Sequence, residues 1–380
     1  MRMAMKTVRS ARLIIVWGFA AIIATESIAQ APVLWKGNIS KEGDVTVVHN
    51  PKEPIYKNEI VTIKEELSIG GENAPSEEVL SLVTDIDTGT DGRIFIVDFQ
   101  QREIIIVDKF GKFLRKFGKK GQGPGEFLLV TELSYCAAQN ELFVHDHLRG
   151  SYFDADGNFK RSVPYRFNFT SVKADAQGNL RGIVQVQEGN RVRYELKMLD
   201  ERGNPGTSLA KTPDIDIGVE NPFMPILNWC IQQDGSIADG YPETYEILTH
   251  DINGRIVKRI LKDFDPIEVT AAEREIWTKS IPPSMKKTKF AFSRYHAAYA
   301  ALASDERGWI YVGTWEKARD GKTFIIDIFD QAGRYIAKAE WPGVGSVLRF
   351  KDGKLYAVSQ DENGYPVVKR YALVWRKDIR

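Results

Sequence analysis

Residues 83–118 read VTDIDTGTDGRIFIVDFQQREIIIVDKFGKFLRKFG, and this stretch indicates four short β-strands. Asp91-Gly92 predicts a tight turn between the first two strands, because Asp-Gly between β-rich runs is a strong hairpin signal. A polar link at 98–103 precedes a third, apolar strand, and residues 109–112 turn into a fourth. The stretch therefore predicts one antiparallel sheet of four strands.

The same pattern recurs in five further units along the chain. The first turns of the six units contain Gly92, Asn140, Gly178, Gly235, Gly308 and Gly353. About 40–50 residues with four strands is the size of one propeller blade. Six such sheets around an axis cover one another and leave only short edges. We therefore predict an all-β fold, a six-bladed β-propeller with four-stranded blades; a seven-bladed ring or a two-sheet sandwich is the alternative.

The last unit, residues 344–375, lacks a clear fourth strand. Residues 59–69, EIVTIKEELSI, precede the first unit and alternate as a strand does. We predict that this N-terminal strand completes the sixth sheet and closes the ring. The propeller then spans 58–376 and follows an N-terminal extension at 30–57.

The first 29 residues have the three-part layout of a secretory signal peptide. Basic residues precede an apolar run at 13–24, and Ser27-Ile28-Ala29 places small residues before a cut. The run is shorter than the roughly 20 residues that span a bilayer. We predict that 1–29 is a signal peptide and that the protein is exported, either periplasmic or extracellular. A retained anchor is the alternative.

Charge and cysteine content narrow the function classes. The chain has 52 Lys and Arg against 51 Asp and Glu, and no basic stripe, which argues against a nucleic-acid partner. No later segment is apolar enough to be transmembrane. Cys136 and Cys230 lie in apolar strand-like runs, which favours two separate buried thiols over a disulfide. We expect a monomer that needs no cofactor.

Several motifs indicate a family. Residues 91–98, DGRIFIVD, with Arg102 and 110–114, FGKFL, resemble an NHL-type repeat, and 121–127, GQGPGEF, is similar to the loop between blades in that group. Over 55–375 the chain resembles the bacterial exported 6-bladed β-propeller proteins, which are NHL- and TolB-like and mostly uncharacterised. The resemblance implies the fold, and a fold alone does not specify a function.

Two polar motifs are candidates for chemistry. His145 and His147 end a strand, and alternation places both rings on one side, about 7 Å apart. A catalytic zinc needs about three protein ligands. We therefore predict no metal site, with these two histidines as weak candidates. Asp98 lies four residues before Arg102, which predicts a blade-stabilising ion pair; a ligand-facing acid is the alternative.

The segment 265–296 is the least blade-like part and reads as a partly helical insertion. Thr270 followed by Glu273 is typical of a capping box, and Pro282-Pro283 ends the helix. Basic and aromatic residues follow it: Lys286, Lys287, Lys289, Phe290, Phe292 and Arg294. A solvated lid is one interpretation, and a lid over a ligand with anionic or aromatic groups is the other.

Propeller topology places the long links on one face. Links between second and third strands, and between blades, open there, whereas the tight Gly turns open on the opposite face. Loops on a rigid scaffold often carry binding sites. We therefore predict a ligand face with eight candidate residues: His147, Arg149, Tyr241, Arg294, Tyr295, His296, Trp315 and Lys317.

These features favour a non-catalytic binding scaffold for a protein, peptide or glycan. No complete Ser-His-Asp or metal constellation is readable in the sequence. The alternative is a propeller enzyme, such as a lyase, a lactonase or a glycan-active hydrolase, with its site at the central channel. A structural subunit of an envelope complex is a third hypothesis. The catalytic residues are unknown.

Overall fold

The computed structural model describes residues 34–282, 288–321, 323–340, 348–376 and 379. All of them belong to the compact unit Leu34–Arg380. The predicted signal peptide at 1–29 lies outside the described residues. Within them, no helix is long and apolar enough to cross a membrane.

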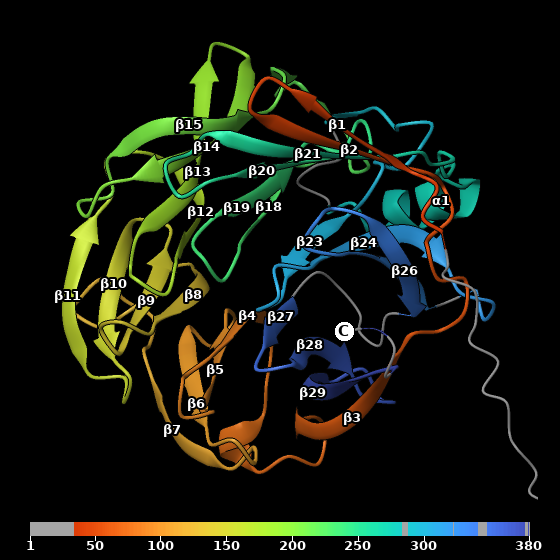
Figure 1. Ribbon diagram of the computed structural model, residues 1–380. Helices are drawn as coiled ribbons and strands as arrows, with labels where there is room; N and C mark the ends of the chain where they lie inside the picture. The colour runs from red at the N-terminus through yellow and green to blue at the C-terminus, as the bar shows by residue number, and fades with distance from the viewer. Residues whose placement is uncertain (1–33, 283–287, 322, 341–347, 377–378, 380) are drawn as a thin grey trace, which may run out of the picture. The chain divides into compact units, whose positions relative to one another are not determined.

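Six four-stranded antiparallel sheets form the blades of a propeller (Figure 1). Blade 1 contains β4 (Val83–Thr88), β5 (Ile94–Asp98), β6 (Glu103–Val107) and β7 (Phe113–Phe117). Blade 2 contains β8 (Val130–Cys136), β9 (Glu141–Asp146), β10 (Arg149–Asp154) and β11 (Phe159–Pro164). Blade 3 contains β12 (Phe169–Ala174), β13 (Leu180–Glu188), β14 (Arg191–Leu199) and β15 (Pro205–Lys211). The short β16 (Ile215–Asp216) also pairs with β14.

The second half of the chain repeats the pattern. Blade 4 contains β18 (Asn228–Ile231), β19 (Ile237–Gly240), β20 (Glu246–His250) and β21 (Ile256–Lys262). Blade 5 contains β23 (Ala301–Ser304), β24 (Ile310–Lys317), β25 (Phe324–Phe329) and β26 (Tyr335–Glu340). Blade 6 contains β27 (Leu348–Lys351), β28 (Lys354–Gln360), β29 (Pro366–Trp375) and β3 (Val61–Gly70). The predicted six-bladed all-β fold is confirmed.

The ring closes as the sequence predicts. Strand β3 pairs antiparallel with β29, from Val61 opposite Trp375 to Gly70 opposite Val367. The sixth blade thus joins both ends of the propeller. A short 3₁₀ turn at Ser76–Glu78 then leads into blade 1.

The segment before β3 holds a hairpin that the sequence did not predict. Strands β1 (Asn38–Glu42) and β2 (Val45–Asn50) pair with each other, and β2 pairs in parallel with β21 on the outer edge of blade 4 (Figure 1). Asn50 is buried and donates to the carbonyls of Leu261 and Gly333. The hairpin therefore covers the outer edge of blade 4 and contacts blade 5.

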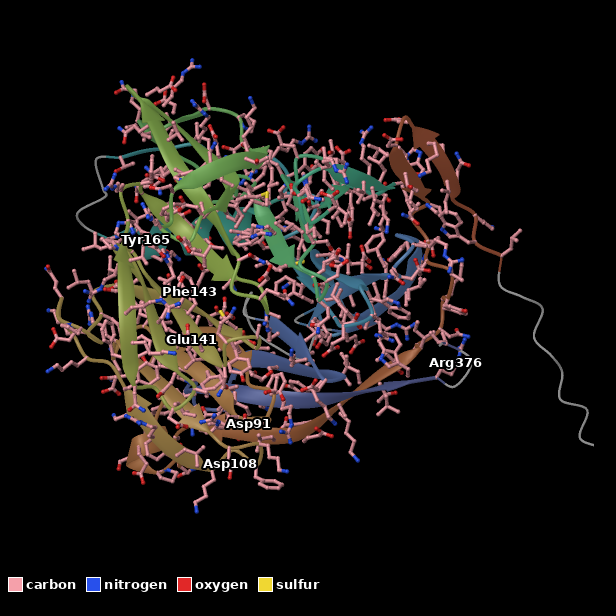
Figure 2. All side chains as sticks on the ribbon, turned by 60° about the vertical axis from the view of Figure 1, so that its left-hand side comes forward. Asp91, Asp108, Glu141, Phe143, Tyr165 and Arg376 are labelled. Carbon is pink, nitrogen blue, oxygen red and sulfur yellow. The ribbon has the colours of Figure 1, made fainter. Side chains whose placement is uncertain are left out.

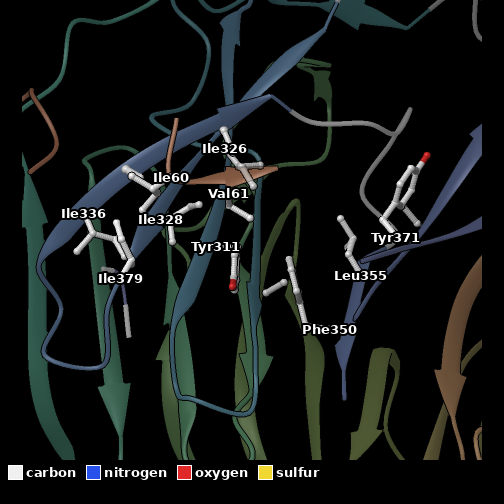
Figure 3. Close-up of a cluster of buried hydrophobic side chains, with 14 residues drawn as sticks. Ile60, Val61, Tyr311, Ile326, Ile328, Ile336, Phe350, Leu355, Tyr371 and Ile379 are labelled. Atoms are coloured by element: carbon white, nitrogen blue, oxygen red, sulfur yellow. The ribbon is translucent and has the colours of Figure 1, made fainter. Parts of the chain in front are cut away.

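Hydrophobic side chains fill the spaces between blades. Figure 3 shows one such cluster, in which Ile326 and Ile328 of blade 5 lie near Leu355 of blade 6. The rings of Tyr311 and Phe350 stack there with centroids 3.9 Å apart. Blade 1 buries both faces of its sheet in this way, which explains why its middle strands, IFIVD and EIIIV, are apolar at nearly every position.

Tight turns form the face opposite the long links. Gly92 has φ +83°, a backbone conformation that a side chain disfavours. Between the third and fourth strands of blades 1–5 an Asp lies three residues before a Gly: Asp108, Asp154, Asp200, Asp251 and Asp330; the same pattern at Asp361 lies between the second and third strands of blade 6. Each of these carboxylates accepts backbone N–H bonds within its own turn. In Figure 2, Asp91 and Asp108 mark the two turns of blade 1 at this face.

Candidate functional site

The insertion at 265–296 contains the predicted helix, α1 (Ala271–Ser280). The Thr270 hydroxyl accepts from the Glu273 amide, and the Glu273 carboxylate accepts from the Thr270 amide. This is the predicted capping box. No residue of the helix is buried, so the helix lies on the surface of the propeller.

Backbone contacts join the two longest links of the long-loop face. Strand β22 (Lys289–Phe290) of the insertion pairs in parallel with β17 (Val219–Glu220), which lies between blades 3 and 4. The Ala291 amide also donates to the Glu220 carbonyl. Lys286 and Lys287 of the predicted basic cluster lie outside the described residues.

His296 and Trp315 come together on this face. The two rings stack with centroids 4.4 Å apart and 19° between their planes. His296 Nε2 lies 3.2 Å from Glu273 Oε1, and the Phe223 ring contacts the edge of the imidazole. His296 is 8% exposed, so it connects α1 to blade 5 as a packed group.

An apolar pocket of about 380 Å³ lies beside this stack. Segments far apart in the sequence supply its lining, which includes Phe223, Met224, Ile226, Tyr299, Trp315 and Phe324. Trp315 Nε1 is buried and has no hydrogen-bond partner among the described residues. We call this the face pocket. It offers walls that are mostly apolar.

Three other predicted residues lie near the insertion or the pocket. Arg294 pairs with Glu268 at 3.2 Å, and its guanidinium lies 5.0 Å from the ring of Tyr295, which is 38% exposed. Lys317 Nζ lies over the ring of Phe324, a pocket residue. Burial lowers the pKa of Lys317. These residues place positive charge on the same face.

The remaining predicted residues lie elsewhere. Arg149 donates to the carbonyls of Gln122, Gly123 and Glu126, so its guanidinium holds the predicted inter-blade loop. His147 is half-buried at the end of β9. Tyr241 packs against the apolar cluster between blades 3 and 4. The structure does not bring these three residues to the face pocket.

His145 is a buried, neutral imidazole that contacts Tyr165. It is 1% exposed, and its Nδ1 lies 3.2 Å from the Tyr165 hydroxyl. Burial lowers the pKa of His145 to about 3, because the charged imidazolium is poorly solvated there. Among the described residues, no three His, Cys, Asp or Glu side chains are grouped to hold a metal ion.

The predicted Asp98–Arg102 pair is replaced by other contacts. Asp98 accepts from the amides of Ser81 and Gln101, and Arg102 donates to the carbonyl of Leu128. Asp146 in blade 2 likewise accepts from two backbone amides of the link before it. These carboxylates bind the backbone of the inter-blade link because its N–H groups lack ladder partners.

The first strands of all six blades surround a central channel of about 320 Å³, which the sequence had suggested only as the location of an alternative enzyme site. In Figure 1, the labels of β4, β8, β18, β23 and β27 lie toward the middle of the ring. Asp85, Asp87, Glu132, Lys173 and Arg349 line the channel together with Ser and Asn side chains. Asp175, Asp305 and Glu306 line its end at the tight-turn face.

Carboxylates of one inner strand bind the backbone of the next. Asp85 accepts from the Leu133 amide at 3.1 Å, and Asp87 accepts from the Tyr135 amide at 2.8 Å. Glu132 in turn accepts from the Val172 amide at 2.8 Å. These bonds connect β4 to β8 and β8 to β12, where no β-ladder exists.

Two basic side chains pair with these acids. Lys173 Nζ lies 3.2 Å from Asp85 and 3.9 Å from Glu132. Burial and the nearby Arg349 charge both act to lower the pKa of Lys173. The negative charges of Asp85 and Glu132 outweigh these two effects, so the pKa of Lys173 is raised. Arg349 Nε and Nη2 donate to the two oxygens of Asp87 at 2.8 and 2.9 Å.

The carboxyl group of Glu132, which lines the channel, has a raised pKa. Its carboxylate accepts from the Ser171 hydroxyl as well as from Val172. Burial raises the pKa of Glu132 to about 7; Lys173 opposes this shift and Asp85 adds to it. Both protonation states are therefore populated at neutral pH.

Both cysteines are free thiols, as predicted. Cys136 is buried between blades, whereas Cys230 lines the channel. Burial raises the pKa of Cys230 to about 11, so the thiol stays protonated at neutral pH. It is therefore a poor nucleophile.

The first strands of blades 1–3 share a sequence pattern that marks the channel. The strands VTDIDT, VTELSY and FTSVKA of blades 1–3 share an apolar residue, a Thr and then alternating polar side chains. The alternating polar positions face the channel. Aligning the first strands of the repeats would have revealed them.

Comparisons with known proteins agree with the fold. The family model DUF5128, described as 6-bladed beta-propeller, matches residues 77–223. The predicted resemblance to the bacterial six-bladed propellers is confirmed, and the likeness to NHL and TolB proteins stays a prediction. No curated protein matches the sequence.

Solved structures of low sequence identity share the architecture. A Bacteroides fragilis protein provisionally described as exported has a TM-score of 0.53 and 12% identity, covering 87% of this chain and 100% of its own. A DUF4221 protein from Bacteroides vulgatus has a TM-score of 0.50 and 9% identity, covering 83% of this chain and 99% of its own. At these identities the likeness shows the fold alone.

Proposed function

We propose that the protein is an exported, non-catalytic binding scaffold that takes a protein or peptide at the face pocket. The carrying observation is the pocket itself, about 380 Å³ and lined by aromatic and aliphatic side chains beside the His296–Trp315 stack. Filling such a pocket with a Leu or Phe side chain is worth about 1.5–3 kcal/mol.

The chemistry of the lining favours a peptide over a glycan. Thr314 contributes a hydroxyl in an otherwise mostly apolar lining, so the hydroxyls of a sugar would find few partners there. Arg294 and Lys317 on the same face favour an acidic residue next to the apolar anchor.

Peptide selection tests this proposal. Binders selected from a random peptide library on the wild-type protein are expected to carry an apolar anchor beside Asp or Glu. Trp315→Ala is expected to weaken them about tenfold or more, because an aromatic wall of the pocket is lost. Phe110→Ala is the matched control, since Phe110 is 73% exposed in a turn of the opposite face. Binders indifferent to Trp315→Ala contradict the proposal.

An enzyme with its site in the channel is the second candidate function. The observation in its favour is Glu132, whose pKa of about 7 suits a general acid or base at neutral pH. A panel of lactones, glycosides and uronates tests it. Turnover that Glu132→Gln abolishes while the variant stays folded supports an enzyme, and binding without turnover supports the scaffold.

Export is tested separately, because residues 1–29 lie outside the described structure. N-terminal sequencing of the protein recovered from the periplasm or the medium is expected to begin at Gln30. Retention of Met1 would contradict export by a cleaved signal peptide.

A further inference from the structure

The carboxylates of Asp85 and Asp87, in the middle of the channel, accept most of their hydrogen bonds from groups of the channel wall. Asp87 accepts from the amides of Thr88 and Tyr135 and from Arg349. Asp85 accepts from the Leu133 amide and from Lys173. Anything that enters the channel therefore finds few free acceptors at these acids.

The basic residues, by contrast, keep donors for a ligand. Arg349 uses Nε and Nη2 on Asp87, and its Nη1 has no partner among the described residues. The side chains of Lys173 and Arg349 are 32% and 36% exposed, whereas those of Asp85 and Asp87 are 10% and 2% exposed. All four line the channel, so the more exposed Lys173 and Arg349 present N–H donors to the lumen.

We propose that the channel binds a small hydroxylated ligand through its single carboxylate, held by Lys173 and Arg349. Ser134, Ser304 and Asn228 also line the channel and suit the ligand hydroxyls. The volume of about 320 Å³ fits a molecule of monosaccharide size, such as a sugar acid. Asp175, Asp305 and Glu306 make the tight-turn end acidic, so the carboxylate enters from the long-loop end.

Binding of the ligand carboxylate depends on the protonation state of Glu132. The pairs Asp85–Lys173 and Asp87–Arg349 are neutral, which leaves Glu132 as the mid-channel group whose charge changes near pH 7. Asp85 from β4, Lys173 from β12, His145 from β9 and Tyr165 after β11 surround Glu132.

The protonation state of Glu132 then decides how well the anion binds. Ionised Glu132 repels the ligand carboxylate, whereas protonated Glu132 donates a hydrogen bond. One coupled proton makes binding roughly five- to tenfold tighter at pH 6 than at pH 8. Glu132→Gln, which is neutral at both pH values, removes this dependence.

Calorimetric titration of the full chain with D-glucuronate tests the site. D-glucose, which lacks the carboxylate, and acetate, which lacks the hydroxyls, are expected to bind far more weakly. Lys173→Met and Arg349→Met each weaken glucuronate binding roughly 10- to 100-fold, the range for a charged hydrogen bond. Lys351→Met is the matched control, because Lys351 lines the channel without an ion pair to Asp85 or Asp87.

The conservative variants keep the test decisive if a Met variant fails to fold. Lys173→Arg and Arg349→Lys retain the charges and are expected to bind glucuronate more weakly than the wild type but more tightly than glucose. No detectable glucuronate binding by the wild type, equal binding of glucose, or unchanged affinity in the Lys173 and Arg349 variants overturns the proposal. This site is separate from the face pocket, so its failure leaves the Trp315 result unaffected.

Discussion

The two sides of the channel wall are built differently. In blades 1 and 2 the first strands carry carboxylates that accept backbone N–H bonds from the next blade, as Asp87 does from Tyr135, and the first strand of blade 3 carries Lys173, which pairs with Asp85. In blades 4 and 5 the first strands, NWCI and ALAS, carry no charge, and Ser304 donates to the Ile231 carbonyl. The channel wall therefore has two sectors. In the charged sector, formed by the first strands of blades 1–3, charged groups connect neighbouring blades. In the neutral sector, formed by the first strands of blades 4 and 5, the side chains carry no charge.

The largest expected difference between the sectors is in stability. Asp87→Ala leaves the Arg349 guanidinium and the Tyr135 amide without their partner, so we expect a loss of about 2–3 kcal/mol in the free energy of unfolding. Ser304→Ala removes one neutral hydrogen bond and should cost about 1 kcal/mol. Denaturant titration of both variants measures the two losses in the free energy of unfolding. Equal losses would contradict a difference between the two sectors.

A smaller effect is the pH dependence of stability that we expect from Glu132. Its folded pKa of about 7 lies above its ordinary value of 4.5, so the folded protein holds a proton between these values that the unfolded chain releases. The wild type therefore loses stability as pH rises through this window, whereas Glu132→Gln does not. The free energy of unfolding of Glu132→Gln minus that of the wild type is therefore expected to be about 1–3 kcal/mol larger at pH 8 than at pH 5.

Denaturation midpoints of both proteins at several pH values measure this slope. A constant difference across the window would mean that Glu132 titrates like an exposed carboxyl. That result would also remove the basis for coupling a proton to anion binding in the channel.

The smallest effect lies in the neutral sector, at Cys230. Because burial raises the pKa of Cys230 to about 11, its thiolate fraction near pH 8 is roughly 100-fold below that of an ordinary thiol. In a Cys136→Ala background, the native protein should react with a disulfide reagent about that much more slowly than the unfolded chain does. Equal rates would indicate that the channel is polar and open at Cys230.

The repeated turn motifs predicted the fold because a tight turn is specified by residues that are adjacent in the sequence. Gly92 and its counterparts needed only their own neighbours to be recognised, and the closing strand β3 was found because the last unit lacked a partner. The hairpin β1–β2 was missed because its parallel pairing with β21 joins residues about 210 apart in the sequence. Local propensity carries no information on such a contact.

The site was only partly predictable for the same reason. His296 and Trp315 were assigned to the correct face by topology, yet their stacking depends on how the insertion folds back. Topology also places Arg149 on the ligand face, but its guanidinium donates to three loop carbonyls. The channel cluster combines residues from blades 1, 2, 3 and 6, and their convergence follows from ring closure.

Lys173 and Arg349 give the charged sector of the channel a second role, as a binding site, beside its structural one. A crystal structure of the protein soaked in D-glucuronate at pH 6 tests it most directly. We predict the ligand carboxylate within hydrogen-bond distance of Lys173 Nζ and Arg349 Nη1, with the Asp87–Arg349 pair intact. An unchanged channel without the sugar acid, in crystals whose channel mouth is open to solvent, would contradict it.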